Sequence, residues 1–358
     1  MKRRMIEILS KEEHHKELSM LSISVVMPTF NTNVAILQEA VESILSQTFH
    51  DFEFIIIDDG STDDSYDYLR GLHDERIKLI RNPYNQGITK SLNIGLSHSR
   101  GKYIARMDSD DIAMPFRLEK QFTFMERHPD VIACGSNVEV FGTESFTTHN
   151  SITDMEVYRI RMVFSNPGPI HPTAFLRREP LLRYHIKYDE ALIHSQDYGL
   201  WVDISRHGKV YILEEALIKR RIHPHQVTKT RRKVQIRCDQ ITQERLLKEL
   251  LGNVTSEELA FHYLYSTGYY KNITINNEVL DWYKRLVEAN DRVGVYDKKK
   301  FRDYVYHSVL KRIIYQSFDQ NTSISTKIAT LFRCLPFPIA MGTVKEMIIR
   351  KMLNHFRN

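Results

Sequence analysis

Short β-rich runs that alternate with helical stretches constrain the fold of this chain more than any other feature. The runs lie at 23–27, 53–58, 76–81, 102–107 and 131–141. Helical spacing of apolar residues fills two of the intervals between them, cleanly over 34–47 and less cleanly over 87–97. Strands that alternate with helices in this way are typical of βα units on a mainly parallel sheet. We therefore predict a layered α/β domain.

The pattern changes towards the C-terminus. Residues 142–230 are mixed, with a helix expected after Thr153, strands at 173–177 and 210–213, and a helix over 197–207. The following stretches are helical: 236–251, 256–267, 278–289, 297–315 and 343–356. The domains we predict are an N-terminal extension (1–21), an α/β domain (22–233, with halves 22–141 and 142–233) and an all-helical region (234–358).

Composition limits the class of protein. A chain of 358 residues that is 42% hydrophobic can bury a substantial core. Its net charge of +5 favours anionic partners such as nucleotides, pyrophosphates or acidic lipid head groups, and does not by itself indicate nucleic acid, which we do not expect as a partner. Cys134, Cys238 and Cys334 are far apart, which indicates a reducing compartment. No apolar segment follows the basic N-terminal residues, and the longest nearly uncharged run, 328–341, is too short to span a membrane, so we expect a cytoplasmic protein.

Two carboxylates end the second β-rich run. The apolar residues 55–57 are followed by Asp58 and Asp59 and then by Gly60. Ligands of open α/β sheets bind beyond the carboxyl ends of the strands, where Asp59 could accept a hydrogen bond from the N–H of a nucleobase. The alternative is that both residues cap the helix that follows.

A second acidic group ends the fourth β-rich run, where Asp108, Asp110 and Asp111 follow residues 103–107. Carboxylates two residues apart on a turning chain can bind one hard divalent cation, which in turn bridges pyrophosphate oxygens. An acidic surface loop without an ion would show the same residues, so the pattern alone leaves both interpretations open.

Further sequence motifs lie beside the predicted strands and helices, as the two acidic groups do. They are Val25-Val-Met-Pro28-Thr-Phe30-Asn31, Ser46-Gln-Thr-Phe49, Asn82-Pro83-Tyr-Asn85-Gln-Gly87, Asn93-Ile-Gly95 and Met114-Pro115-Phe-Arg117-Leu-Glu. Together the motifs resemble the N-terminal signature of the family 2 glycosyltransferases, which have a GT-A fold. The resemblance covers roughly residues 22–225.

The resemblance implies a donor site in the N-terminal half. Pro28, Phe30 and Asn31 would frame the nucleotide base, Asp59 would bind the base, and Asn85 would lie on the same nucleotide-sugar side.

The acidic loop matches the family's DxD motif. Asp110 would bind Mn²⁺ or Mg²⁺ on the diphosphate, Asp108 would contact the ribose or the metal's hydration shell, and Asp111 could share these roles.

Segments nearer the C-terminus resemble the acceptor side of the family. Ser195-Gln196-Asp197-Tyr-Gly-Leu-Trp201 is similar to the family's Glu-Asp-x-x-Leu-Trp segment, whose aspartate is the catalytic base. Gln196 replaces the usual glutamate, which removes a charge beside the implied base Asp197. Capping of a helix is the alternative role for Asp197.

Two basic segments complete the resemblance. The strand that contains His171 resembles the acceptor-side strand, and 218–225 resembles the closing basic segment. There Arg221 would bind the pyrophosphate and His223 would join the metal shell. A solvated basic loop is the alternative.

Taken together, the resemblance implies an inverting, metal-dependent transferase. It would move a hexose-type sugar from a nucleotide-diphosphate donor to a hydroxyl of a glycan or a polyprenyl-diphosphate-linked saccharide. UDP is the expected nucleotide because it is frequent among donors of the family. The basic helices around Phe301, Tyr304 and Val305, and over 343–356, could lie on an anionic membrane surface or pack within the protein.

Other classes fit less well. A sugar-phosphate nucleotidyltransferase usually has a glycine-rich, lysine-containing loop after its first strand, and residues 27–32 lack one. Dinucleotide-dependent redox enzymes need a GxGxxG motif that this position also lacks. Multi-span processive synthases carry a Gln-x-x-Arg-Trp motif that is missing. An inactive glycan-binding module remains the third alternative.

Overall fold

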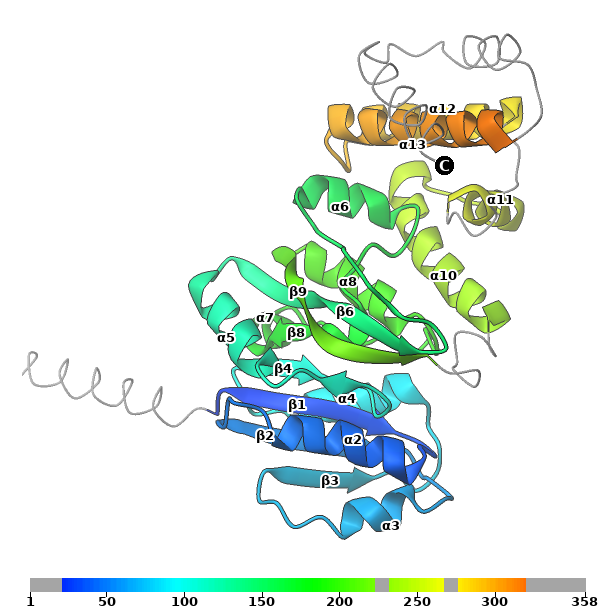
Figure 1. The fold of residues 1–358 in the computed structure, drawn as a ribbon. Coiled ribbons are helices and arrows are strands. Elements are labelled where there is room, and N and C mark those ends of the chain that lie inside the picture. Colours follow the sequence, from blue (N-terminus) through cyan, green and yellow to red (C-terminus); the bar gives the residue numbers. More distant parts are fainter. Residues whose placement is uncertain (1–20, 223–231, 267–275, 320–358) are drawn as a thin grey trace, which may run out of the picture. The chain divides into compact units, whose positions relative to one another are not determined.

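The computed structural model describes residues 21–222, 232–266 and 276–319. The chain forms two compact units (Figure 1). The α/β unit comprises Met1–Met155 and Gly168–Asp239, and the helical unit comprises Glu156–Pro167 and Gln240–Asn358.

The strands are β1 (Ile23–Thr29), β2 (Phe52–Asp58), β3 (Ile77–Arg81), β4 (Tyr103–Arg106), β5 (Ile112–Ala113), β6 (Val131–Gly142), β7 (Phe146–Thr147), β8 (Phe175–Arg177) and β9 (Lys209–Ile222). The helices are α2 (Val34–Leu45), α3 (Ser65–Arg70), α4 (Ile88–His98), α5 (Arg117–Arg127), α6 (Met155–Met162), α7 (Arg178–Arg183), α8 (Gln196–Ser205), α10 (Arg232–Leu251), α11 (Ser256–Ser266), α12 (Asn277–Val293) and α13 (Lys298–Asp319), and η1 (His171–Thr173) is a 3₁₀ turn.

One mixed sheet organises the α/β unit, with strand order β3-β2-β1-β4-β8-β6-β9-β5 and β7 beside β6. The strands from β3 to β4 are parallel. Strand β8 then enters antiparallel to both β4 and β6, while β6 and β9 are parallel. The predicted α/β architecture is confirmed, and the predicted parallel pairing holds for β3-β2-β1-β4. Strand β9 extends well beyond the predicted 210–213, because its second half pairs with β6 up to Gly142.

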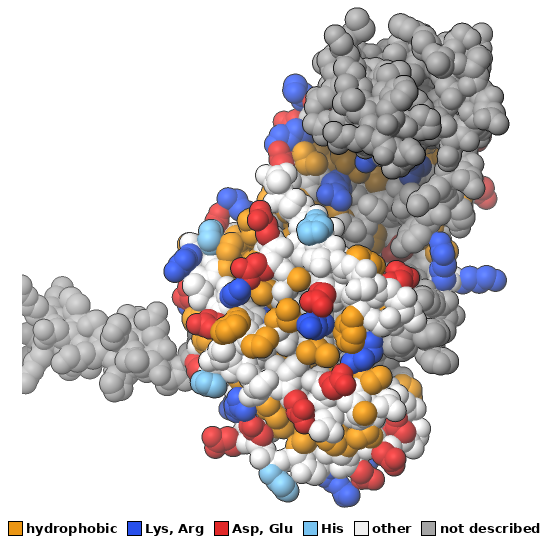
Figure 2. All heavy atoms as spheres, in the orientation of Figure 1, with side chains coloured by type: hydrophobic (Ala, Val, Ile, Leu, Met, Phe, Trp, Pro, Cys, Tyr) orange, Lys and Arg blue, Asp and Glu red, His pale blue; other side chains and the backbone are white. Residues whose placement is uncertain are grey.

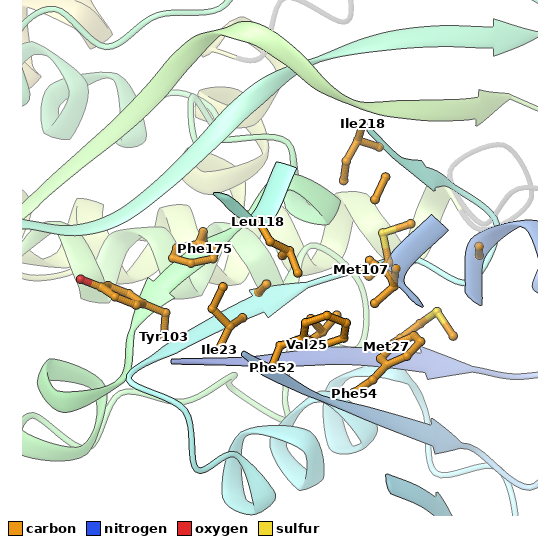
Figure 3. Packing of buried hydrophobic residues seen from close by; sticks show 14 of the residues in the cluster. Ile23, Val25, Met27, Phe52, Phe54, Tyr103, Met107, Leu118, Phe175 and Ile218 are labelled. Atoms are coloured by element: carbon orange, nitrogen blue, oxygen red, sulfur yellow. The ribbon is translucent and has the colours of Figure 1, made fainter. Parts of the chain in front are cut away.

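The central strands are covered on both faces, which explains their nearly continuous apolar sequences. On one face, Val25 and Phe54 pack in a core with helix residues such as Val41 of α2 and Leu118 of α5 (Figure 3). On the other face, α4 approaches so closely that a Cβ on Gly95 would lie 2.3 Å from a methyl carbon of Val26.

The parallel strands bring the carboxyl ends of β1, β2 and β3 to one edge, where Thr29 pairs with Asp58 and Asp58 with Arg81. The turn after β2 depends on Gly60, whose φ is +74° and whose added Cβ would lie 2.6 Å from the carbonyl carbon of Tyr84. Only glycine fits both requirements. The loops after β2 and β3 can therefore lie directly against each other.

The helical unit includes a short segment, Glu156–Pro167, that precedes most of the α/β unit's second half in the sequence. The ring of Phe164 lies 5.4 Å from that of His262. His262 binds the carbonyl oxygen of Val163 through Nε2 at 2.8 Å, and its Nδ1 accepts a hydrogen bond from the indole N–H of Trp282 at 3.1 Å. This segment is therefore part of the core of the helical unit.

In the predicted apolar stripe of α13, Tyr304 is partly buried, whereas Phe301 and Val305 are fully enclosed. These two residues support packing rather than membrane contact. The helix predicted over 343–356 lies outside the described residues. Within the described part of the chain, no helix is both long and apolar enough to cross a bilayer. Acidic and basic side chains are interspersed over the described residues on the face drawn in Figure 2, so the positive net charge is not gathered there.

Candidate active site

The acidic loop after β4 gathers three carboxylates. Oxygen atoms of Asp108, Asp110 and Asp111 all lie within 4.8 Å of one another. The backbone N–H of Arg221 donates to Oδ1 of Asp111 at 2.9 Å, while Oδ2 of Asp111 is buried without a hydrogen-bond partner. Burial, and then the charges of Asp108 and Asp110, raise the pKa of Asp111 well above its usual range.

These observations test the predicted metal site. A divalent cation would satisfy the unpaired oxygen of Asp111 and offset the repulsion among the three carboxylates, which are the hard ligands that Mg²⁺ and Mn²⁺ prefer. The loop therefore fits such an ion. It brings Asp110, the predicted metal ligand, together with Asp108 and Asp111.

Buried arginines support this loop from the sheet side. The guanidinium of Arg106 forms an ion pair with Asp108. Arg117, fully buried at the start of α5, donates to the carbonyl oxygens of Arg106 at 2.5 Å and Pro172 at 2.9 Å. Burial, followed by the charge of Arg106, lowers the pKa of Arg117 to about 9. Arg117 thus fixes the end of β4 from which the acidic loop leaves.

The motif around Gln47 holds the segment that follows the acidic loop. Its side chain donates to the carbonyl oxygen of Met114 at 2.8 Å and accepts from the backbone N–H of Leu118 at 3.0 Å. The hydroxyl of Thr48 donates to Glu119 at 2.8 Å. Two motifs about 70 residues apart in the sequence are therefore one structural feature.

Arg221 lies beside the acidic loop. Its Nε donates to the carbonyl oxygen of Asp110 at 3.1 Å, its Nη2 pairs with Glu39, and its guanidinium carbon lies 4.5 Å from the ring centroid of Phe141. These contacts hold the loop; the predicted contact with pyrophosphate stays a prediction. His223, the second predicted metal ligand, lies outside the described residues.

Asp59 is buried at the turn after β2. Its Oδ1 accepts hydrogen bonds from Nδ2 of Asn82 at 2.7 Å and the backbone N–H of Gln86 at 3.0 Å, and its Oδ2 accepts from the N–H of Gly87 at 2.8 Å. Asn85 belongs to the same turn and accepts from Gly87 at 3.1 Å. An ionised carboxylate accepts about four hydrogen bonds, so Asp59 keeps capacity for one more partner.

The loop after β1 is tied to its neighbours by side chains. Asn31, with φ of +47°, accepts from the backbone N–H of Thr62 at 2.8 Å. The hydroxyl of Thr32 lies 3.0 Å from that of Thr29 and 2.9 Å from that of Ser109, which links this loop to the acidic loop. Of the other two predicted base-framing residues, Phe30 is 43% exposed, whereas Pro28 is buried within β1 and pairs with Ile57.

Asp197 lies in the first turn of α8, and Ser195, with φ of +57°, is the capping residue. Asp197 is therefore not the helix cap. Burial raises the pKa of the nearby Tyr188 hydroxyl; Arg106 opposes this effect, and Asp197 and Asp108 add to it. The charge of Asp197 therefore acts on the same buried hydroxyl as the charge of Asp108.

Helix α4 holds the segment that leads to Asp197. The side-chain amide of Asn93 donates to the carbonyl oxygen of Tyr188 at 2.9 Å and accepts from its N–H at 3.0 Å, while the hydroxyl of Thr89 donates to the carbonyl oxygen of Leu192 at 2.8 Å. The Asn93 motif, noticed in the sequence, thus holds the segment that precedes the predicted base Asp197. Tyr188 and Arg106 were not predicted as site residues, although an arginine inside a buried apolar strand is a detectable signal.

Comparisons with known proteins point to one family. The model of the family described as "Glycosyl transferase family 2" matches residues 24–184. An uncharacterised glycosyltransferase of Haemophilus influenzae is 36% identical over 225 residues, which is 58% of this chain and 67% of that protein. WfaP of Escherichia coli, named a UDP-Glc:alpha-D-GlcNAc-diphosphoundecaprenol beta-1,3-glucosyltransferase, is 31% identical over 194 residues, or 52% of this chain and 71% of its own length.

Among solved structures, S. aureus TarS 1-349 in complex with UDP-GlcNAc superimposes with a TM-score of 0.57 at 16% identity, covering 85% of this chain and 93% of TarS 1-349. At this identity the match is one of fold.

Proposed function

Because the chain belongs to glycosyl transferase family 2 and has the GT-A fold, we propose that it moves a hexose-type sugar from a UDP-sugar to an acceptor hydroxyl with inversion of the anomeric carbon. The acceptor would be a glycan or a polyprenyl-diphosphate-linked saccharide used in polysaccharide biosynthesis. The observation that carries this proposal is the cluster of Asp108, Asp110 and Asp111 at the strand edge that also holds Asp59.

The donor would span two loops. Asp59 has one remaining acceptor site for a nucleobase N–H, and the exposed ring of Phe30 offers a surface against the base. The three carboxylates of the acidic loop would hold Mn²⁺ or Mg²⁺ against the diphosphate. When bound, the cation would neutralise the negative charge that develops on the leaving group.

Asp197 would act as the general base. As the acceptor oxygen forms its bond to the anomeric carbon, the bond from that carbon to the diphosphate oxygen breaks, and the acceptor proton passes to Asp197. Attack from the face opposite the diphosphate inverts the configuration. General-base assistance of this kind contributes roughly 10²–10⁴-fold in rate.

The choice of substrates is supported by a relative. WfaP is named for transfer from UDP-Glc to a diphosphoundecaprenol-linked GlcNAc. We propose a chemically similar pair of substrates for this chain. An acceptor of this kind would place the enzyme on the cytoplasmic face of a membrane, where its basic residues could meet anionic lipids.

A screen of UDP-, GDP- and dTDP-sugars, with and without Mn²⁺, tests this function through donor hydrolysis and thermal stabilisation. We expect a UDP-sugar to be hydrolysed only with metal, and Asp110→Ala to abolish that activity. A chain that binds UDP-sugars but neither hydrolyses nor transfers them would instead be the inactive glycan-binding module. Release of pyrophosphate from UTP and a sugar phosphate would identify a nucleotidyltransferase.

A further inference from the structure

Arg106 is a buried cation beneath the acidic loop. Its side chain is only 4% exposed and pairs with Oδ1 of Asp108, whose side chain is 30% exposed. The Nε and Nη1 atoms of Arg106 are buried without hydrogen-bond partners. Burying an arginine N–H group without a hydrogen-bond partner destabilises the folded state, and arginines in protein cores are rare unless they are paired.

The backbone of Arg106 is held on both sides. Its N–H donates to the carbonyl oxygen of Ala174 at 2.9 Å, and its own carbonyl oxygen accepts from Arg117 at 2.5 Å. The side chain of Arg106 therefore leaves from a fixed point of the sheet. A fixed guanidinium can hold the Asp108 carboxylate in one orientation.

Arg106 also lies near the acceptor-side residues. The buried imidazole of His171 binds the hydroxyl of Tyr188 at 2.9 Å. Burial, and then the charge of Arg106, lower the pKa of His171 well below its ordinary value. The same hydroxyl of Tyr188 is influenced by Asp197. Arg106 is thus close to both the acidic loop and the surroundings of the proposed base.

We propose that Arg106 is a positioning residue of the transfer reaction: it orients the Asp108 carboxylate, so that the acidic loop holds its cation and the donor diphosphate in one arrangement. This inference rests on the proposed function. Without Arg106, the Asp108 side chain would be free to rotate away from the orientation in which it supports the bound cation.

The test compares Arg106→Met and Arg106→Lys with a matched control, Arg100→Met. Arg100 also pairs with a buried carboxylate, Glu53 at 2.8 Å, but at the opposite ends of the strands, because Glu53 lies at the start of β2. Each variant is measured for the half-saturating Mn²⁺ concentration in the presence of UDP, for kcat and donor KM, and for its melting temperature.

We expect Arg106→Met to lower kcat/KM by about 10²-fold, the effect of a small displacement in an active site, and to raise the half-saturating Mn²⁺ concentration. Arg106→Lys should recover part of both losses. Arg100→Met should stay within about twofold in activity, the range of a distant surface substitution. Because Arg106 is proposed to act through Asp108, adding Arg106→Met to Asp108→Asn should cost little beyond Asp108→Asn alone.

The proposal is overturned if Arg106→Met folds and binds Mn²⁺ as tightly as the wild type, or if the double variant shows the full product of both losses. If Arg106→Met does not fold, Arg106→Lys is the deciding variant. A half-saturating Mn²⁺ concentration and a donor KM equal to those of the wild type would then contradict the proposal. A wild type that transfers no sugar while Arg106→Met still weakens Mn²⁺ binding would refute the proposed function and leave only the part of this inference that concerns cation binding by the acidic loop.

Discussion

Replacing Asp59 by asparagine should damage both the α/β unit and its binding of UDP. The carboxylate accepts from Asn82, Gln86 and Gly87 at 2.7, 3.0 and 2.8 Å. An amide keeps one oxygen and places an N–H₂ group where the other oxygen accepted. Hydrogen bonds to a charged group contribute about 1.5–3 kcal/mol and neutral ones about 0.5–1.5 kcal/mol, so the loss of one bond and the weakening of two should total about 5 kcal/mol.

For a domain of this size that loss corresponds to a melting temperature lower by about 10–20 °C. If the remaining acceptor site of Asp59 binds the base, the dissociation constant of UDP should also rise about 10–100-fold, as expected for the loss of one charge-assisted hydrogen bond. The assays are differential scanning calorimetry and isothermal titration with UDP.

Asp63→Asn is the matched control, because that carboxylate is exposed and accepts a hydrogen bond from the N–H of Ser65 at 3.0 Å. It should melt within about 1–2 °C of the wild type, the range of a surface substitution. An Asp59→Asn protein that melted with the control would show that the carboxylate does not hold the 82–87 turn. Unchanged UDP affinity in a folded variant would remove Asp59 from the donor site.

Three further outcomes follow from particular contacts. Thr32→Val removes the hydroxyl that lies within hydrogen-bond distance of both Thr29 and Ser109, so the donor KM should rise and the free energy of unfolding should fall by about 1–2 kcal/mol. Thr32→Ser should recover both properties. Equal kinetics of the two variants would show that the Thr32 hydroxyl does not support the donor site. Asp197→Asn should lower kcat by about 10²–10⁴-fold while UDP affinity stays unchanged, and a kcat near that of the wild type would exclude Asp197 as the base. Burial lowers the pKa of His262 from 6.5 to about 4, so the folded state keeps this imidazole neutral while the unfolded chain takes up a proton. The free energy of unfolding of the helical unit should therefore decrease by up to about 3 kcal/mol as the pH falls from 6.5 to 4. Urea unfolding followed by circular dichroism should show this pH dependence of stability in the wild type. A pH dependence that persists in His262→Gln would assign the effect to another group.

The strands and the acidic strand ends were predictable because their signals are local. A buried apolar run followed by Asp58-Asp59 or by Asp108-Ser109-Asp110 can be recognised from about ten consecutive residues. Strands β1, β2 and β4 accordingly lie within two residues of their predicted bounds.

Contacts that depend on distant pairing were not predictable. The antiparallel insertion of β8 between β4 and β6 has no local signature, and the second half of β9 is polar enough to resemble a basic loop until its pairing with β6 is known. The role of Arg106 required the same knowledge, because its partner Asp108 and its support Arg117 meet only in the folded sheet.

Phe164 belongs to the helical unit although it precedes Gly168–Asp239 of the α/β unit in the sequence, and this limits where the chain can be truncated. Its ring lies 6.3 Å from that of Phe301 and 5.4 Å from that of Tyr304, so its neighbours come from residues far along the chain. A shortened protein that stops near residue 239 would keep the sheet but leave Phe164 and Val163 without the helices that enclose them. Such a fragment should be prone to aggregate. An exchange of the helices between relatives would therefore have to include residues 156–167 as well.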